Sequence, residues 1–264
     1  MVGLVTRRRE HLGDDRFDVV FYEVKDVTGR RVDPEASAVN MVSCHGDSAR
    51  ADDPAYVAVD DEGRPATRDR RYFDWGYVCP THPEYREGLL ELVDRCVAVA
   101  PDVRLDDVGF PRQEYCHCER CDRHFAESGF ADRRAWRADV VSAVVTDARE
   151  RVPGRLYLTL YPDPMPGHLR ARSGLDLERL EALVDTFVVP IYDLAYTTTY
   201  WLEVLASGFA DRLRSPFIVE LYGPEVDPDR LRHAMAVANA YATGVAVAYD
   251  DDRAVEAVEA GWLE

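Results

Sequence analysis

The chain has 264 residues, and 47% of them are hydrophobic, which is enough to bury the core of one large domain. Acidic residues number 49 against 32 basic ones, a formal charge of −17 that disfavours nucleic-acid binding because phosphates would be repelled. No apolar run approaches the ~20 residues that cross a bilayer, and the first residues contain no apolar stretch of signal-peptide length, so we expect a cytoplasmic protein with no membrane partner.

The positive charge is almost entirely arginine, because Lys25 is the only lysine. An acidic surface poor in lysine is typical of proteins from a high-salt cytoplasm, where salt screens the repulsion between like charges. We therefore expect a halophilic protein. The alternative is an acidic surface without adaptation to salt.

Along the chain, short apolar runs rich in β-branched residues alternate with amphipathic segments. In the first half, strands are predicted at residues 2–5, 17–24 and 38–44, a hairpin at about 55–69, a helix at 81–99 and a fourth strand at 103–110. In the second half, helices are predicted at 133–152, 175–185, 199–214, about 227–241 and 252–263, and strands at 155–163, 186–193, 216–223 and 244–251. The late strands are apolar along most of their length, which indicates strands covered on both faces.

Eight strands with alternating helices predict an α/β fold, a closed (β/α)8 TIM barrel that forms a single domain over residues 1–264. The hairpin at about 55–69 is expected to be an insertion into that barrel. An open doubly wound sheet is the alternative. It would more naturally carry a glycine-rich phosphate loop, and the chain contains no GxGxxG or Walker motif.

In such a barrel the active site lies at the carboxyl ends of the strands. Glu220 interrupts the apolar run FIVELYG there, and Asp106 and Asp107 end the fourth strand. Two opposed carboxylates are what glycoside hydrolysis requires, one to protonate the leaving oxygen and one to attack or to activate water. The candidate catalytic residues are therefore Asp106, Asp107 and Glu220. Side chains expected to bind a sugar, mostly by stacking, are Trp75, Tyr161, Tyr192, Asp193 and Tyr222.

The cysteines predict a metal site. Cys116, Cys118 and Cys121 lie within six residues, and in a reducing compartment such clustering favours a metal over disulfides. Structural zinc takes four ligands, and Cys79 is the expected fourth because its loop neighbours theirs at the same end of the barrel. Rival fourth ligands are Cys44, His82, His117 and His124. Four thiolates leave no open position, so this zinc would be structural.

A family resemblance rests on these residues. Cys-x-Cys-x-x-Cys after the fourth strand, with an earlier Cys after the third, resembles the zinc clasp of family 42 glycoside hydrolases, the microbial β-galactosidases. In that family the fourth strand ends in Asn-Glu, the Glu being the general acid/base, and the seventh strand ends in the nucleophilic Glu. The resemblance implies that Asp107 takes the place of the acid/base, Asp106 that of the Asn and Glu220 that of the nucleophile. It covers the barrel alone, and Asp107 is one methylene shorter than the family's Glu.

A second assignment uses the same stretch. Arg104 and Asp106 have the Arg-x-Asp spacing of α-amylase-like barrels, in which that Asp is the nucleophile. Strand alternation would then place Arg104 and Asp106 inside the barrel and Asp107 on the other face. The sequence leaves open which of the two aspartates faces the site.

The sequence therefore predicts a glycoside hydrolase with a carbohydrate substrate and a structural zinc. An alternative is a non-catalytic barrel that binds a sugar or a protein partner, suggested by Asp in place of Glu at position 107. A third hypothesis is a metal hydrolase whose zinc is held by His45 and Asp47 in the barrel mouth. Neither the sugar nor the oligomeric state follows from the sequence.

Overall fold

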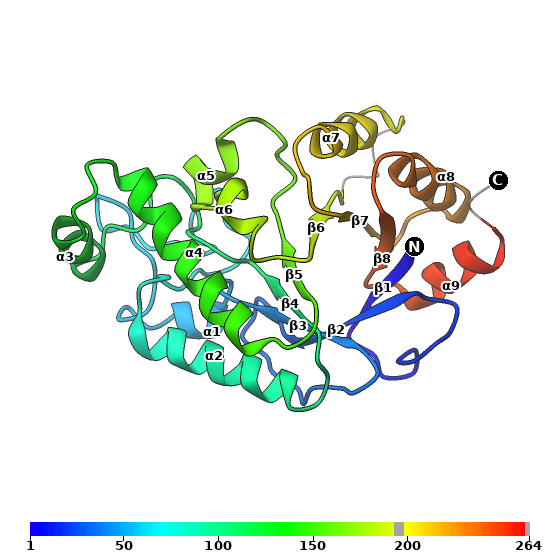
Figure 1. Cartoon of the computed structure of the whole chain (residues 1–264), viewed down its shortest axis with the longest axis horizontal. Coiled ribbons are helices and arrows are strands. Elements are labelled where there is room, and N and C mark those ends of the chain that lie inside the picture. Colours follow the sequence, from blue (N-terminus) through cyan, green and yellow to red (C-terminus); the bar gives the residue numbers. More distant parts are fainter. Residues whose placement is uncertain (193–197, 262–264) are drawn as a thin grey trace.

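The computed structural model describes residues 1–192 and 198–261, and its centre is a closed barrel of eight parallel strands (Figure 1). The strands follow chain order around the barrel, and β8 pairs back with β1. They are β1 (Val2–Thr6), β2 (Val19–Lys25), β3 (Val39–Ser43), β4 (Val103–Asp106), β5 (Leu156–Thr159), β6 (Thr186–Pro190), β7 (Phe217–Tyr222) and β8 (Gly244–Ala248). The predicted α/β TIM barrel is confirmed.

Helices surround the barrel from β3 onward, whereas loops without a helix join β1 to β2 and β2 to β3. The helices of the described residues are α1 (Ser48–Ala51), α2 (Pro83–Val97), α3 (Glu119–Glu127), α4 (Arg133–Arg151), α5 (His168–Ser173), α6 (Leu177–Leu180), α7 (Tyr200–Ala210), α8 (Pro228–Asn239) and α9 (Asp251–Glu259). Three short helices, α1, α3 and α5, were not predicted from the sequence. Within the described residues, no helix has the length and apolar character that crossing a membrane requires.

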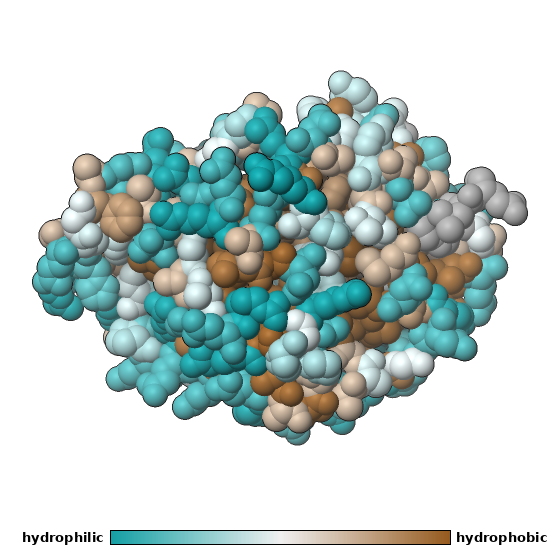
Figure 2. All heavy atoms as spheres, in the orientation of Figure 1, coloured by the Kyte–Doolittle hydropathy of each residue, from teal (hydrophilic) through white to brown (hydrophobic). Residues whose placement is uncertain are grey.

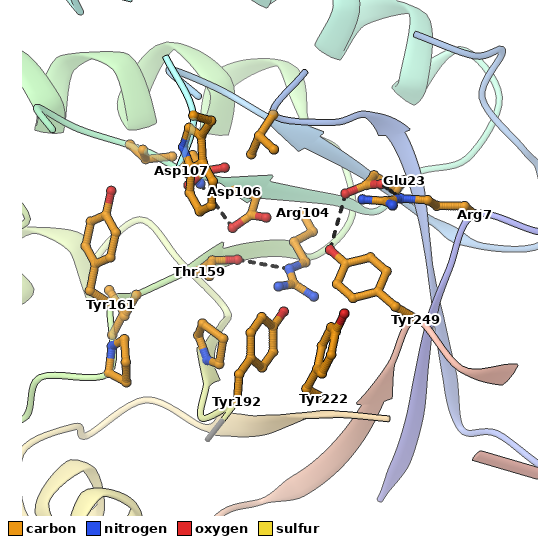
Figure 3. Close-up of a pocket in the computed structure, with 16 residues that line it drawn as sticks. Arg7, Glu23, Arg104, Asp106, Asp107, Thr159, Tyr161, Tyr192, Tyr222 and Tyr249 are labelled. Atoms are coloured by element: carbon orange, nitrogen blue, oxygen red, sulfur yellow. Dashed lines mark hydrogen bonds and ion pairs between the residues drawn. The ribbon is translucent and has the colours of Figure 1, made fainter. Parts of the chain in front are cut away.

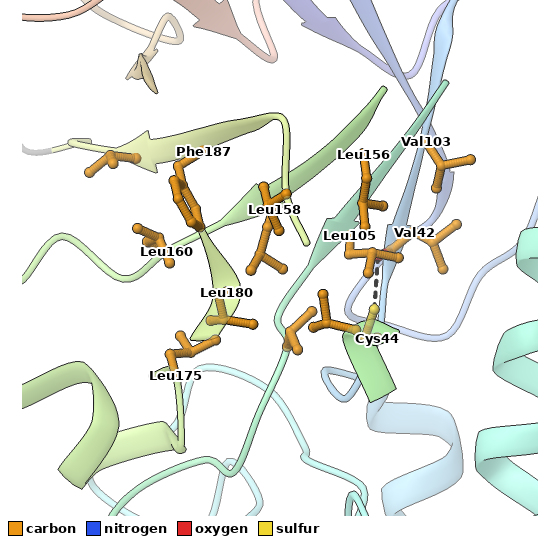
Figure 4. Packing of buried hydrophobic residues seen from close by; sticks show 14 of the residues in the cluster. Val42, Cys44, Val103, Leu105, Leu156, Leu158, Leu160, Leu175, Leu180 and Phe187 are labelled. Carbon is orange, nitrogen blue, oxygen red and sulfur yellow. Dashed lines mark hydrogen bonds between the residues drawn. The ribbon is translucent and has the colours of Figure 1, made fainter. Parts of the chain in front are cut away.

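Strand alternation divides the core into two layers. Side chains pointing outward pack between the strands and the helices; Figure 4 shows Leu105, Leu158 and Phe187 in this layer. Inside the barrel lies a smaller cluster that includes Phe21, Met41, Tyr157, Val188 and Ile218. Apolar side chains dominate both layers, so the lower part of the barrel is a packed core rather than a channel.

Above the inner cluster the inward positions become polar. Two residues beyond Phe21, Met41, Tyr157 and Ile218 along their strands come Glu23, Ser43, Thr159 and Glu220. The period of two places each of these polar side chains on the same inward face, one step nearer the carboxyl end. The barrel mouth is therefore lined by polar groups that stand on an apolar floor.

The chain between α1 and α2 contains a tight antiparallel turn where the sequence predicts an inserted hairpin. Val59 bridges Pro65, and the amide of Ala66 donates to the carbonyl of Ala58 at 2.8 Å. This turn is tied to the cysteine loop, since the amide of His117 donates to the carbonyl of Val59 at 2.8 Å. Residues 57–66 thus contact the segment that follows β4.

Candidate active site and cysteine cluster

A cavity of about 560 Å³ opens at the carboxyl ends of the strands (Figure 3). Its wall combines charged groups with aromatic rings. The lining residues are Arg7, Glu23, Val27, Trp75, Arg104, Asp106, Asp107, Val108, Thr159, Leu160, Tyr161, Pro162, Pro190, Tyr192, Tyr222 and Tyr249. This position at the mouth is where barrel enzymes bind their substrates.

Both aspartates of the Asp106-Asp107 pair line this cavity. Asp106 ends β4 on the same inward face as Arg104. Asp107 has a φ of +48°, a left-handed conformation that non-glycine residues rarely adopt, so strand alternation no longer governs where its side chain points. The alternatives in which one aspartate faces the site and the other faces away are therefore wrong, because the backbone turns between them.

Asp107 is partly buried in the cavity wall, where two hydrogen bonds hold it. Its Oδ2 lies 2.9 Å from the hydroxyl of Ser43, and its amide donates to Oδ1 of Asp106 at 3.0 Å. Burial raises the pKa of Asp107 to about 8, and the negative charge of Asp106 acts in the same direction. A carboxyl group whose pKa is raised in this way is suited to hold the proton that a general acid donates.

Glu220 points into the barrel, but it lies beneath the cavity wall rather than on it. Arg104 forms a buried ion pair with Oε2 of Glu220, and the hydroxyl of Tyr192 donates to Oε1. Arg104 also donates from Nε to the hydroxyl of Thr159 at 3.0 Å, and its guanidinium lies 4.9 Å from the ring centroid of Phe21. Both oxygens of the Glu220 carboxylate are thus engaged by protein donors.

One wall of the cavity is built from three tyrosines. The ring of Tyr222 lies between those of Tyr192 and Tyr249, with centroids 5.3 and 6.3 Å away. Figure 3 shows the hydroxyls of Tyr192 and Tyr222 directed toward Arg104. Tyr249 donates to Glu23 at 3.2 Å, and Glu23 is also paired with Arg7.

The predicted sugar-binding residues fall into two groups. Trp75, Tyr161, Tyr192 and Tyr222 all line the cavity. Asp193 lies outside the described residues, so the structure has no bearing on it.

Several residues of the cavity wall were not predicted from the sequence. Glu23 and Thr159 were detectable, because each lies two residues beyond an inward apolar residue. Arg7 and Tyr249 carried no such signal: Arg7 follows the end of β1, and Tyr249 follows β8 with a φ of +67°.

His45 and Asp47, the ligands of the metal-hydrolase hypothesis, are both used by the protein itself. His45 Nδ1 accepts the amide of Gly109 at 3.0 Å, and burial lowers its pKa to about 3. Asp47 accepts from Lys25 at 3.2 Å and from the hydroxyl of Tyr85 at 3.0 Å. These contacts hold the loop after β3 in place.

Four cysteines converge at a separate place, and they are Cys79, Cys116, Cys118 and Cys121. Their sulfurs all lie within 4.8 Å of one another, and Cys79 Sγ is 3.7 Å from that of Cys118 and 3.4 Å from that of Cys121. A tetrahedral zinc with Zn–S bonds of about 2.3 Å separates its sulfurs by about 3.8 Å. The four sulfurs therefore fit a closed tetrahedral metal site.

Polar groups around the cluster lie within hydrogen-bond distance of the sulfurs, as outer contacts of metal thiolates do. The hydroxyl of Thr81 lies 3.2 Å from both Cys79 Sγ and Cys121 Sγ, and the amide of Val59 donates to Cys116 Sγ at 3.4 Å.

The rival fourth ligands have other partners. Cys44 belongs to the outward core layer, and His82 caps α2 through Nδ1. His117 faces Asp122, and His124 lies in the last turn of α3.

Comparisons with known proteins bear on the fold. No family model matches the chain, and no curated protein sequence matches it. Among solved structures, the chain is similar to the glycoside hydrolase domain of PgaB (BpsB) from Bordetella bronchiseptica, with a TM-score of 0.73 and 15% identity over 95% of this chain and 89% of that one. The catalytic GH53 domain of Ignisphaera aggregans gives a TM-score of 0.46 and 11% identity over 90% and 75% of the two chains. The similarity to the PgaB domain shows a shared barrel fold.

Proposed function

We propose that this protein is a glycoside hydrolase whose carbohydrate substrate binds in the cavity at the barrel mouth. The observation that carries the proposal is Asp107, a carboxyl group with a pKa raised to about 8 in the wall of a cavity bounded by aromatic rings. The fold shared with the glycoside hydrolase domain of PgaB supports the same reaction class. Fold similarity alone would not suffice, because one barrel hosts many chemistries.

Asp107 is the proposed general acid. It would donate its proton to the glycosidic oxygen as the bond to the leaving group breaks. Once Asp107 is ionised, two negative charges stand side by side, and the repulsion from Asp106 favours recovery of a proton from the incoming water. Asp107 is therefore suited to act first as an acid and then as a base.

Glu220 is the proposed second carboxylate, as the family 42 resemblance implies. Its ion pair with Arg104 supplies the positive charge that a buried carboxylate needs. Attack on a bound sugar requires the hydroxyl of Tyr192 to leave Oε1. Tyr192 stands at the mouth with 40% of its surface exposed, so substrate can displace that hydroxyl.

The aromatic wall is proposed to bind the sugar. Trp75, Tyr161, Tyr192 and Tyr222 present ring faces or edges to the cavity, and aromatic rings offer a broad apolar contact for the C–H face of a pyranose. Asp106 is proposed to accept a hydrogen bond from a sugar hydroxyl.

The four-cysteine cluster is proposed to hold a structural zinc. Four thiolates leave no open coordination position, so the ion would supply no step of the reaction. Its role would be to tie the segment that carries Cys79 to the loop that follows β4. Trp75 and Tyr77 lie just before Cys79, and Trp75 belongs to the cavity wall.

The proposal is tested by assaying purified protein against a panel of aryl glycosides and oligosaccharides at high salt. We expect turnover by the unaltered protein and a loss of about 10²–10⁴-fold in kcat for Asp107→Asn and for Glu220→Gln. Asp61→Asn, which removes an exposed carboxylate from the turn at residues 60–63, is the matched control and should keep full activity. Equal activity in all four proteins would overturn the proposal.

A second candidate function is a non-catalytic sugar-binding barrel. The observation in its favour is that Arg104 and Tyr192 engage both oxygens of Glu220, which keeps this carboxylate off the cavity wall. Calorimetry separates the two functions. Saturable sugar binding without turnover, with the same affinity in Glu220→Gln, would favour the binding barrel.

A further inference from the structure

Three oxygen atoms form a short chain behind the cavity wall. Asp107 Oδ2 lies 2.9 Å from Ser43 Oγ, and Ser43 Oγ lies 2.8 Å from the carbonyl oxygen of Gly46. Both separations are ordinary O–H···O hydrogen-bond distances. Ser43 is the last residue of β3 and only 2% exposed, so the hydroxyl has no access to water that could supply another partner.

The number of available hydrogens limits which atom donates in each of these two hydrogen bonds. Two hydrogen bonds need two hydrogens, and the Ser43 hydroxyl supplies one. The Gly46 carbonyl has none to give and can only accept, so the Ser43 hydrogen is directed at Gly46. For both contacts to be hydrogen bonds at the same time, the other hydrogen must come from a protonated Asp107, because the distances alone would equally allow Ser43 to donate to an ionised Asp107.

The Gly46 carbonyl is fixed in its accepting position by a buried lysine. Lys25 Nζ donates to this carbonyl at 3.0 Å, to the carbonyl of Ser43 at 2.8 Å and to Asp47 at 3.2 Å. These three contacts use all three hydrogens of the ammonium group. A carbonyl oxygen has two lone pairs, so Gly46 can accept from Lys25 and from Ser43 at the same time.

The position of Gly46 shows how tightly this chain is packed. A Cβ at this residue would lie 2.9 Å from Asp107 Oδ2 and 3.0 Å from both Ser43 Oγ and Trp75 Nε1. No side chain larger than hydrogen fits there without moving the three groups. The backbone of the loop after β3 therefore approaches the Asp107 carboxyl directly.

We propose that Ser43 is a positioning residue that holds Asp107 in its protonated form, by accepting the carboxyl hydrogen while donating its own to Gly46. This rests on the proposed function, in which Asp107 is the general acid. Ser43 touches no substrate in this account. It acts through Asp107, whose carboxyl group it keeps protonated and therefore neutral.

Several other groups face Asp107 and set the background against which Ser43 acts. They are Glu23 and Lys25 of β2, Cys44 and His45 after β3, Asp106 of β4, Tyr77 before α2 and Tyr161 after β5. Burial and Asp106 raise the pKa of Asp107, whereas a hydrogen bond donated by Ser43 and the charge of Lys25 lower it. The direction of the Ser43 hydrogen bond therefore decides the sign of its effect, and a bond accepted from the protonated carboxyl raises the pKa instead.

The test is a pH titration of the Asp107 carboxyl group, monitored by isotope-edited infrared spectroscopy. The carboxyl signal is obtained by subtracting the spectrum of Asp107→Asn from that of the unaltered protein. We expect the midpoint to fall by about one pH unit in Ser43→Ala, a tenfold change in the protonation equilibrium. Ser142→Ala is the matched control, because Ser142 is a buried serine on α4 that forms no side-chain hydrogen bond within the described residues. Its midpoint should equal that of the unaltered protein.

The sign of the shift decides the outcome. A Ser43 hydroxyl that donated to an ionised Asp107 would stabilise the charged form, so its removal would raise the midpoint. A raised or unchanged midpoint in Ser43→Ala therefore overturns the proposal. A midpoint below about 5 in the unaltered protein would also overturn the proposal, even if Ser43→Ala does not fold, because it would show that nothing retains the proton.

The titration uses no substrate, so this proposal and the proposed function can fail separately. If the midpoint falls in Ser43→Ala but the unaltered protein hydrolyses no glycoside, the role of Ser43 is supported and the proposed enzymatic function is wrong. Turnover together with an unshifted midpoint would sustain the enzyme and remove the role of Ser43.

Discussion

Arg104 and Glu220 form the most deeply buried ion pair at the barrel mouth, and each has about 1% of its side chain exposed. A buried charge left without its partner is costly, whereas a pair replaced as a whole is not. The cation is also held by Thr159 and by the ring of Phe21, so the pair is part of the frame of the site.

Replacing Arg104 alone should therefore destabilise the fold strongly. Arg104→Met is expected to lower the free energy of unfolding by about 3–5 kcal/mol, because Glu220 stays buried and unpaired. The double variant Arg104→Met, Glu220→Gln should recover most of that loss. Denaturant unfolding measures both, and a double variant no more stable than the single one would contradict the explanation.

A surface pair serves as the matched control for this measurement. Arg253 pairs with Glu256 at 3.0 Å, and both side chains are exposed. Arg253→Met should lower the free energy of unfolding by no more than about 1 kcal/mol.

Asp107 should make stability depend on pH. Its folded pKa of about 8 exceeds the value of about 3.9 in an unfolded chain, so the folded state binds more protons between these values. The contribution to stability is fully present below about pH 4 and is lost as the pH rises toward 8. We expect Asp107→Asn to flatten this part of the stability curve, as followed by urea unfolding at several pH values. An unchanged slope in the variant would show that Asp107 is not the group responsible.

The acids at positions 106, 107 and 220 could be found from the sequence, but their arrangement could not. Glu220 was detectable because it interrupts an apolar strand. The left-handed φ of Asp107 was not, because no glycine or turn motif marks it. The contacts of Arg104 and Tyr192 with Glu220 join three strands that are far apart in sequence, and no local pattern reports such contacts.

At the scale of elements, the eight strands could be predicted because each is a short apolar run whose inward and outward positions are both buried. The helices that were missed are short or polar. The helix α3 is short and mostly polar, and its one fully buried residue is Cys121. Besides the cysteine cluster, Phe125 connects α3 to the core, since its ring centroid lies 5.7 Å from that of Trp136.

The cysteine cluster links two segments that border the cavity. Cys79 precedes α2, whereas Cys116, Cys118 and Cys121 lie in the loop after β4 and in α3. The turn at residues 57–66 is attached to the same loop through both backbone groups of Val59. We propose that one metal ion orders all three segments.

Removal of the metal should therefore loosen these segments first. We expect Cys118→Ser, or treatment with a strong chelator, to lower the melting temperature by about 5 °C or more, which corresponds to roughly 2 kcal/mol in a chain of this size. Hydrogen exchange should speed up in residues 57–66 and 116–121 before it does in the strands. Cys96→Ser, a buried cysteine on α2 away from the cluster, is the control for metal content. Full zinc content in Cys118→Ser would contradict the assignment of this site.

At the scale of the whole molecule, the net charge of −17 dominates. Figure 2 shows a surface on which hydrophilic residues cover most of the visible face, with hydrophobic patches gathered toward its middle. Self-repulsion at this charge opposes the compact state. We propose that the protein is adapted to a cytoplasm of high salt content.

Salt should accordingly stabilise the fold. Raising KCl from about 0.1 M to 2 M shortens the screening length to a few ångströms, and we expect the melting temperature to rise by at least about 5 °C. Calorimetry at a series of KCl concentrations measures this rise. A melting temperature that stays flat or falls would mean that the acidic surface carries no adaptation to salt.

The central claim is that Asp107 protonates the leaving group of a glycoside, and the dependence on the leaving group tests it most directly. Asp107→Asn should lose about 10²–10⁴-fold in kcat/KM on glycosides with alkyl or sugar leaving groups, which need a proton. It should keep nearly full kcat/KM on dinitrophenyl glycosides of the same sugar, whose leaving group departs without one. This ratio is the one to measure, because kcat also contains the later step in which Asp107 would act as a base. Equal losses on both kinds of substrate, or no loss on either, would contradict the account.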